Sequence, residues 1–117
     1  VTVLLTGDLE REGEAVLVEA RTDLRSNVLK LGHHGSRTSS SEGFLQAVRP
    51  ELAVASAPAR GRLAFPHATV LERLERRGIP WVWTGRDGAV LVGLPSLEVR
   101  VWRDDGERVR LVREAKP

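Results

Sequence analysis

Short apolar runs recur along the first two thirds of the chain, separated by segments with helical or polar patterns. Each run is too short for a helix and is rich in Val, Leu, Ala or Trp, which is typical of strands buried within a sheet. The predicted strands are residues 1–6, 28–31, 52–55 and 81–83. We expect the first strand, Val1 to Thr6, to be buried on both faces because it is almost fully apolar.

Three helices are predicted between these strands, over residues 9–20, 41–48 and 67–77. In the first helix, apolar residues on one side predict a buried stripe, and acidic residues near the start favour the helix dipole. The stripe consists of Leu9, Ala15, Val16, Leu17 and Ala20, and the acids are Glu10, Glu12 and Glu14. Ser41 is a candidate N-cap of the second helix, Pro50 stops it, and Gly78 ends the third.

The last third of the chain follows a different pattern. Residues 97–102 alternate apolar and charged side chains, which predicts a strand with one wet face. Turns at 85–88, 94–96 and 104–106 divide this part into strands 89–94, 97–102 and 109–112. The predicted order is β-α-β-α-β-α-β followed by a β-meander, an α/β fold in a single domain.

Composition narrows the class of protein. Hydrophobic residues make up 41% and charged residues 29% of the 117 residues, which is ordinary for a folded soluble domain. No apolar run is long enough to cross a bilayer. The chain has no Cys, so a metal site would have to use His, Asp and Glu. The formal net charge of +2 gives no strong overall field, so nucleic-acid binding would need a local basic patch.

Two predicted strands end at a Gly beside a side chain that can bind a metal. Asp8 follows Gly7 after the first strand, and His33-His34 follows Gly32 after the second. Neighbouring parallel strands bring their carboxyl ends to one edge of a sheet, and Asp with neutral imidazoles is a good ligand set for Zn, Mn or Fe. Each residue also has an ordinary structural role open to it, Asp8 as a turn or cap residue and the His pair as part of a loop.

Further polar and aromatic residues are candidates for binding. His67 stands at the start of the third predicted helix, as either a functional residue or simply part of the first turn. The Ser- and Thr-rich segment from Gly32 to Ser41 is either a solvated loop or a phosphate-binding one. Candidate nucleic-acid contacts are Ser36, Arg37, Arg60 and Arg62. The three Trp residues are expected in the core or the sheets, and they are Trp81, Trp83 and Trp102.

Taken together, the two strand ends resemble a known family. The segments from Leu4 to Asp8 and from Leu29 to Ser41 are similar to the metallo-β-lactamase-fold domain at the C-terminal end of ComEC-type competence proteins, which form the DNA-uptake channel of transformable bacteria. The similarity continues through residues 44–50, 52–56, 66–71 and 84–89, and so covers most of residues 1–94.

The resemblance implies a fold and a ligand set. The family's fold is an αββα sandwich with a metal-dependent hydrolytic site between its sheets. By resemblance, Asp8 binds or bridges metal, and His34 is the last His ligand. His33 is a further ligand by this resemblance, and His67 matches the His of the family's Pro-His helix start. Either His33 or His67 would act as a group behind the ligands or as a catalytic proton donor.

The sequence departs from the family's pattern in two places. The segment Ala64-Phe65-Pro66-His67-Ala68 replaces the more usual Gly-His-Pro-His-Pro, and the main metal motif, His-x-His-x-Asp-His, is not in this sequence. The chain also has no Met. We therefore expect residues 1–117 to be one partial domain, the C-terminal half of a metallo-β-lactamase-like fold, with the His-rich half upstream of Val1.

The family's activity gives a specific expectation for the intact domain. A Zn or Mn ion would generate hydroxide near neutral pH and polarise a phosphodiester, so the domain would be a nuclease that degrades the non-imported DNA strand. Expected partners are single-stranded DNA, the upstream half of the domain and a second copy bound through the exposed apolar face. This chain alone would hold metal weakly and lack activity. The expected location is a bacterial cell membrane, with the domain on the outer side.

Two other functions fit the same residues. A free-standing hydrolase of a small ester, lactam or phosphoester would use the same fold, because fold does not fix substrate. A non-catalytic binding or assembly module would instead use the apolar surface that half a sandwich leaves uncovered.

Overall fold

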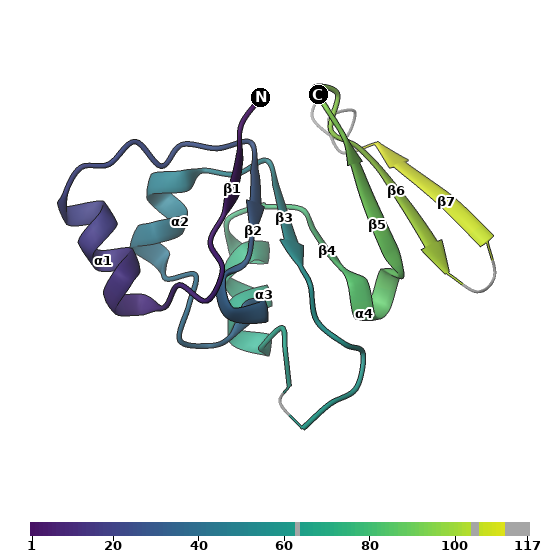
Figure 1. Cartoon of the computed structure of the whole chain (residues 1–117), viewed down its shortest axis with the longest axis horizontal. Coiled ribbons are helices and arrows are strands. Elements are labelled where there is room, and N and C mark those ends of the chain that lie inside the picture. The colour runs from purple at the N-terminus through teal and green to yellow at the C-terminus, as the bar shows by residue number, and fades with distance from the viewer. Residues whose placement is uncertain (63, 104–105, 112–117) are drawn as a thin grey trace.

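The computed structural model describes residues 1–62, 64–103 and 106–111. For Arg103 and residues 106–111 it describes the backbone only. It has three layers (Figure 1): a layer of helices, a four-stranded parallel sheet and a three-stranded antiparallel sheet. The helices of the first layer are α1 (Arg11–Glu19), α2 (Glu42–Val48) and α3 (Ala68–Arg76). The chain is therefore an α/β domain, as predicted.

The parallel sheet follows chain order, β1-β2-β3-β4. Its strands are β1 (Val3–Leu5), β2 (Val28–Lys30), β3 (Leu52–Ala55) and β4 (Trp81–Trp83). Leu29 is paired with Leu4 on one side and with Ala53 on the other. Since side chains alternate between the two faces of a strand, Leu29 and Ala53 face the helices, where they pack with Phe44 and Leu74 in the larger core.

The opposite face of the parallel sheet forms a second, smaller core. Val28, Leu52 and Val82 pack there against Val99 of the antiparallel sheet and against Leu97, which lies in the turn before β6. Buried contacts on both faces explain why the central strands read as continuous apolar runs rather than as alternating ones.

The antiparallel sheet is the predicted meander, in the order β5-β6-β7. It consists of β5 (Ala89–Gly93), β6 (Glu98–Arg103) and β7 (Gly106–Leu111). The last strand begins earlier than the predicted 109–112, and residue 112 lies outside the described residues, as do residues 104 and 105 of the predicted hairpin turn.

The predicted turn at 85–88 is wrong. Residues Thr84–Asp87 form a helical turn, α4, that joins β4 to β5. The backbone N–H of Trp83 donates to the Asp87 carboxylate at 2.9 Å, and the N–H of Gly88 donates to the carbonyl of Thr84. These local hydrogen bonds favour helical geometry over an open turn.

The prediction that the first strand is buried on both faces is also wrong. Val3 is 45% exposed and Leu5 is 71% exposed, although Leu4 packs against the larger core. The register aligns Val3 with Val28, so it shares the face that meets the antiparallel sheet, but that sheet does not cover β1. Strand β1 is one of the two edge strands of the described parallel sheet, and β4 is the other.

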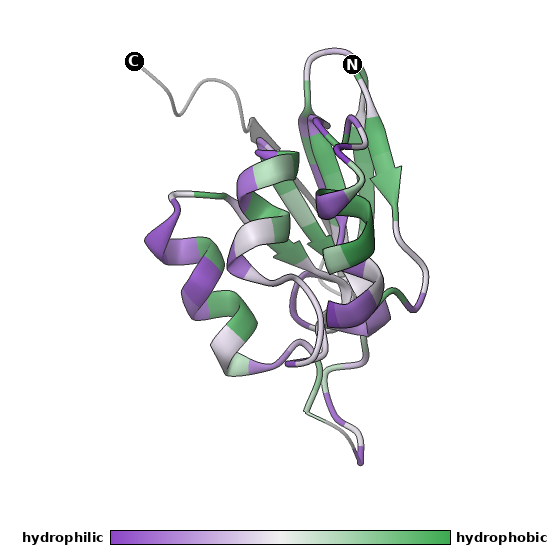
Figure 2. Ribbon diagram, turned by 90° about the vertical axis from the view of Figure 1, so that its left-hand side faces the viewer, coloured by the Kyte–Doolittle hydropathy of each residue, from purple (hydrophilic) through white to green (hydrophobic). Residues whose placement is uncertain are grey.

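Helix α1 differs most from its prediction. Its fully buried residue is Glu14, whereas Val16 is 65% exposed, and Ala15 and Ala20 are exposed as well. Leu9 and Leu17 do pack against the core. Figure 2 shows hydrophilic and hydrophobic residues alternating along the helices, while the strands are mainly hydrophobic. The buried side of the helix is only partly apolar because the Ser-rich segment before α2 packs beside it and binds Glu14.

The predicted helix ends are confirmed. The Ser41 hydroxyl accepts the Phe44 N–H and caps α2. Gly78 has a φ of +65° and follows α3, where the N–H of Ile79 donates to the carbonyl of Leu74. Within the described ranges, no helix is long and apolar enough to cross a membrane.

Candidate functional site

The loops that follow β1 and β2 are joined by backbone contacts. The Gly7 carbonyl accepts the His33 N–H at 2.8 Å, and the Thr6 hydroxyl donates to the Lys30 carbonyl at 2.7 Å. Gly32 has no room for a side chain, since a Cβ there would lie 2.7 Å from the Leu9 carbonyl oxygen. The Gly therefore allows the two strand ends to approach each other, as expected from their sequences.

The His pair lies in a tight turn, η1 (Gly32–Gly35), within the predicted loop, and the backbone at both His residues is not helical. Both residues adopt left-handed backbone conformations, with φ of 48° for His33 and 58° for His34. Such conformations are unusual for residues other than Gly and are found at functional sites where the surroundings hold them.

Each imidazole of the pair is held by its Nδ1 atom. The His33 Nδ1 lies 2.9 Å from the Glu10 carboxylate, and the His34 Nδ1 lies 2.9 Å from the backbone carbonyl of Ser56. Both partners are hydrogen-bond acceptors, so this geometry favours the tautomer that carries its proton on Nδ1 and has its lone pair on Nε2. Metal-binding His residues are held by carboxylates and carbonyls in this way.

Phe65 forms an aromatic wall beside the pair. Its ring centroid is 6.1 Å from that of His34, with the planes inclined by 23°, and 5.7 Å from that of His33. The loop that carries Phe65 is thereby joined to the end of β2.

His67 has a structural role that its sequence position allowed. It is the N-cap of α3, and its Nδ1 accepts the Thr69 N–H at 3.2 Å. Its own N–H donates to the Gly35 carbonyl at 2.8 Å, which places the start of α3 next to the His pair. The ring leaves Nε2 for other contacts.

Asp8 is exposed in the turn after β1. The backbone contact between Gly7 and His33 places this turn beside the His pair. Among the residues that the structure describes, no three His, Asp or Glu side chains form a group that could hold a metal ion. The turns after β1 and β2 and the start of α3 carry the four residues Asp8, His33, His34 and His67 near the carboxyl ends of the strands. Among the described residues, they do not form a complete set of metal ligands.

The Ser- and Thr-rich segment is packed and is not the solvated loop considered above. Ser36, Ser39 and Ser40 are buried. The Thr38 hydroxyl donates to the Glu10 carboxylate at 2.9 Å and lies 2.9 Å from the Ser36 hydroxyl. Hydrogen bonds from Thr38 and then from His33 hold the pKa of the Glu10 carboxyl below its ordinary value.

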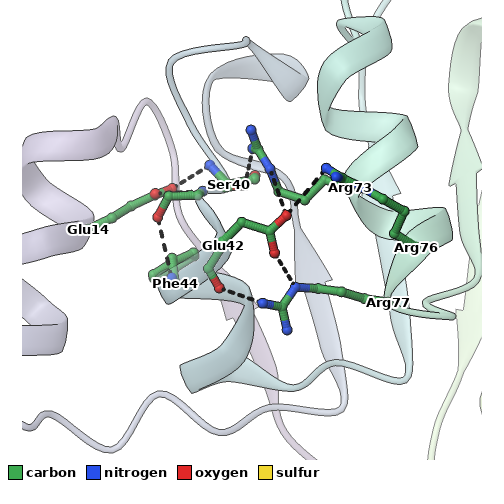
Figure 3. A network of polar contacts seen from close by, with 8 residues as sticks. Glu14, Ser40, Glu42, Phe44, Arg73, Arg76 and Arg77 are labelled. Atoms are coloured by element: carbon green, nitrogen blue, oxygen red, sulfur yellow. Dashed lines mark hydrogen bonds and ion pairs between the residues drawn. The ribbon is translucent and has the colours of Figure 1, made fainter.

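A second acidic residue fixes the end of this segment. Glu14, from α1, accepts the backbone N–H groups of Ser40 at 2.5 Å and Ser41 at 2.9 Å (Figure 3). On the other side, Arg73 of α3 donates to the Ser40 carbonyl at 2.5 Å. Glu42 pairs with Arg77 at 2.7 Å and with Arg76 at 3.4 Å, so α1, α2 and α3 are joined around one loop.

The candidate nucleic-acid residues differ in accessibility. Arg37, Arg60 and Arg62 are exposed, and the last two lie in the loop after β3. Ser36 is only 6% exposed. The Trp residues lie in the sheets as expected, with Trp81 and Trp83 in β4 packed against the larger core and Trp102 in β6.

The residues that support the His pair were not predicted from the sequence. Glu10 and Glu14 were assigned only a dipole effect, yet their carboxylates hold His33 and the Ser-rich segment. Their spacing of four residues on one side of a short helix was the available signal. The carbonyl of Ser56 gave no signal, because a backbone atom is present at every position.

Comparisons with known proteins relate the chain to competence proteins. It is 46% identical over 102 residues to the competence protein ComA of Neisseria gonorrhoeae, 86% of this chain and 15% of that protein. It is 40% identical over 87 residues to the ComE operon protein 3 of Bacillus subtilis, 74% of this chain and 11% of the relative. It is 48% identical over 75 residues to recombination protein 2 of Haemophilus influenzae, 64% of this chain and 9% of the relative.

The chain therefore spans a small part of the length of the curated relatives it matches. No family model matches the sequence. The similarity confirms the competence part of the resemblance described above.

Proposed function

We propose that this chain is part of a metal-dependent hydrolase domain of a competence protein that takes up DNA. The observation that carries the proposal is the His pair, which is held through Nδ1 in left-handed conformations beside the Asp8 turn. The similarity to three competence proteins supports the assignment to DNA uptake. We further propose that the chain is the C-terminal half of a metallo-β-lactamase-like αββα fold, which its helix–sheet–sheet layering supports.

The donor chemistry fits a Zn or Mn ion in part. His34 is exposed, and its Nε2 is bound to no residue that the structure describes. Asp8 is exposed on the neighbouring turn, so both side chains are available as ligands. His33 would lie behind them as a further ligand or proton donor, oriented by Glu10, and His67 would be a second candidate for proton transfer. Structural and catalytic sites need three or four protein ligands, so the remaining ones would come from the His-rich upstream half of the domain.

A bound metal of this kind supplies a hydroxide near neutral pH. The chain's own groups would do the rest: Arg37, Arg60 and Arg62 would attract the phosphates of single-stranded DNA, with Ser36 beneath the surface of that region. The substrate would be the strand that is not imported. The domain would lie on the outer side of a bacterial membrane, where that strand is released.

Elemental analysis tests the proposal directly. The 117-residue chain and a form extended by about one hundred residues upstream would be purified in parallel. We expect only the longer form to hold one or two metal ions and to cleave single-stranded DNA, and Asp8→Ala to remove both properties. Asp23→Ala, also exposed and in the connection before β2, is the matched control. Unchanged metal content and cleavage in the Asp8 variant would refute the proposal.

A second candidate function rests on a different observation. Val3 and Leu5 expose apolar surface on the edge strand β1, and Leu91 and Leu94 do so in and after β5. Exposed apolar patches of this kind are typical of interaction surfaces. If neither the 117-residue chain nor the longer form binds metal, we would assign the chain as a binding or assembly module.

A further inference from the structure

The loop after β3 borders a pocket of about 330 Å³. Three of its lining side chains have distinctive chemistry: the rings of Phe65 and Trp83 and the guanidinium group of Arg60. The other lining residues are small or apolar, and they are Pro58, Ala59, Gly61, Ala64 and Pro66. Among the described residues, the wall therefore contains one cation, Arg60, and no acid, and its two aromatic rings offer planar apolar surface.

One side of this pocket is fixed to β4 and α4. The indole N–H of Trp83 donates to the Ala57 carbonyl at 2.9 Å, and the Thr84 hydroxyl accepts the Ala57 N–H at 3.1 Å. Gly85 lets the backbone pass closely, because a Cβ there would lie 2.6 Å from the carbonyl carbon of Pro58. The Trp83 ring is thus held in place, so this side of the pocket has a fixed shape.

The pocket adjoins the candidate site through Phe65. One face of the Phe65 ring stacks near His34, and the same side chain lines the pocket. A group bound in the pocket would therefore lie next to the His pair. A flexible ligand that fills the pocket would place its neighbouring atoms at the carboxyl edge of the sheet.

We propose that this pocket binds one base of a single-stranded DNA segment, with Phe65 and Trp83 as stacking surfaces and Arg60 on the adjoining phosphate. A planar apolar group joined to an anion matches the two aromatic rings and the cation of the wall. Aromatic side chains beside a basic residue bind single strands without sequence preference. The inference rests on the proposed function only in taking DNA as the ligand, and it assigns a binding role to Phe65 and Trp83.

The test is DNA binding without metal or cleavage. The 117-residue chain would be titrated in EDTA at low salt against a fluorescent oligothymidylate of about eight nucleotides, with fluorescence anisotropy as the readout. An abasic oligonucleotide of the same length keeps the phosphates and lacks the bases. We expect the unmodified chain to bind the abasic probe about tenfold more weakly than oligothymidylate, since stacking on aromatic rings is lost.

Variants separate the two parts of the pocket. Phe65→Leu keeps an apolar side chain and removes the aromatic ring, so we expect about tenfold weaker binding of oligothymidylate and no change for the abasic probe. Arg60→Ala should weaken both probes, whereas Arg25→Ala, at the opposite edge of the sheet, makes the same change in charge and should weaken neither strongly. Circular dichroism confirms that each variant is folded.

The outcomes distinguish this inference from the hydrolase proposal. Equal binding of both probes by the unmodified chain, or no effect of Phe65→Leu on oligothymidylate, overturns the base pocket whatever the metal content of the longer form. If the longer form binds no metal and cleaves no DNA while the 117-residue chain still prefers oligothymidylate, the hydrolase proposal is refuted and the base-binding pocket is supported.

Discussion

The carboxylate of Glu10 lies 2.9 Å from Nδ1 of His33 and at the same distance from the hydroxyl of Thr38. Glu10 comes from the start of α1 and Thr38 from the segment after η1, so one carboxylate joins both to the end of β2. A partner at Nδ1 determines which nitrogen of a neutral imidazole keeps the proton. Glu10 is therefore a positioning residue for His33.

The tautomer of His33 provides the first prediction. In the unmodified chain, we expect the neutral ring to carry its proton on Nδ1, as read from nitrogen chemical shifts in a ¹⁵N-labelled sample. Glu10→Ala removes the acceptor, so the ring should become a mixture of the two tautomers. Glu12→Ala, an exposed Glu in the same helix, should leave the shifts unchanged. A tautomer distribution that is the same in all three proteins would contradict the positioning role.

Glu14 provides a stability prediction. Glu14→Ala leaves the N–H groups of Ser40 and Ser41 without their acceptor inside the protein. Each buried, unpaired polar group costs about 1 to 3 kcal/mol, so for two such groups we expect the free energy of unfolding to fall by about 2 to 6 kcal/mol. Chemical denaturation followed by circular dichroism measures it. Glu12→Ala, whose side chain is exposed, should change stability by less than about 0.5 kcal/mol. A loss of that size in the Glu14 variant as well would show that the buried contacts contribute little.

Acid stability depends on Glu42. Its hydrogen bond with Arg77, followed by the charges of Arg77, Arg76 and Arg73, holds the pKa of its carboxyl below the ordinary value. The unfolded chain binds a proton at an ordinary Glu pKa of about 4.3, whereas the folded chain resists protonation until a lower pH. The contribution of Glu42 is therefore present above about pH 4.3 and is lost as the pH falls through the folded-state pKa.

The melting temperature measured against pH tests this assignment. In Glu42→Gln, we expect a lower melting temperature near neutral pH and a smaller further loss on acidification than in the unmodified chain. Glu72→Gln, an exposed Glu on α3, should retain the full acid dependence. Parallel acid curves for the Glu42 variant and the unmodified chain would show that the ion pairs with α3 do not affect stability.

The exposed edge strand predicts self-association. Val3 and Leu5 present apolar side chains on β1, so we expect the isolated chain to form oligomers that increase with protein concentration. The double variant Val3→Thr/Leu5→Thr replaces both apolar side chains with Thr, which is compatible with a β-strand. We expect it to shift the chain towards monomer in sedimentation velocity. Val16→Thr, on the exposed side of α1, is the control. A chain that is monomeric at all concentrations before any substitution would argue against this surface as an interface.

Local patterns predicted the elements well where a single signal was strong. Strands β2, β3 and β4 were recognised because packing on both faces of the sheet leaves almost only apolar residues in them. Ser41 and Gly78 marked helix ends because capping and a positive φ are properties of one residue and its near neighbours. The meander was recognised from its period of two and its turns.

Other features depended on what packs against an element. The apolar sequence of β1 predicted burial, but exposure is decided by whether another layer covers that edge, and the antiparallel sheet does not. The burial of Glu14 in α1 was not predicted for the same reason. Its carboxylate is buried because another segment supplies the backbone N–H donors of Ser40 and Ser41. The helical turn after β4 depended on a side-chain acceptor four residues along the chain.

The sequence by itself determined the α/β order of elements, the position of Gly7-Asp8 and His33-His34 at strand ends, and the relation to competence proteins. These follow from short-range patterns and residue identities. The tertiary structure alone decided that Glu10 and the Ser56 carbonyl hold the two imidazoles, that the Ser-rich segment is buried, and that Phe65 and Trp83 line one pocket. The physical reason is that these contacts join residues at least 18 positions apart in the sequence. No local pattern specifies which distant donor meets which acceptor.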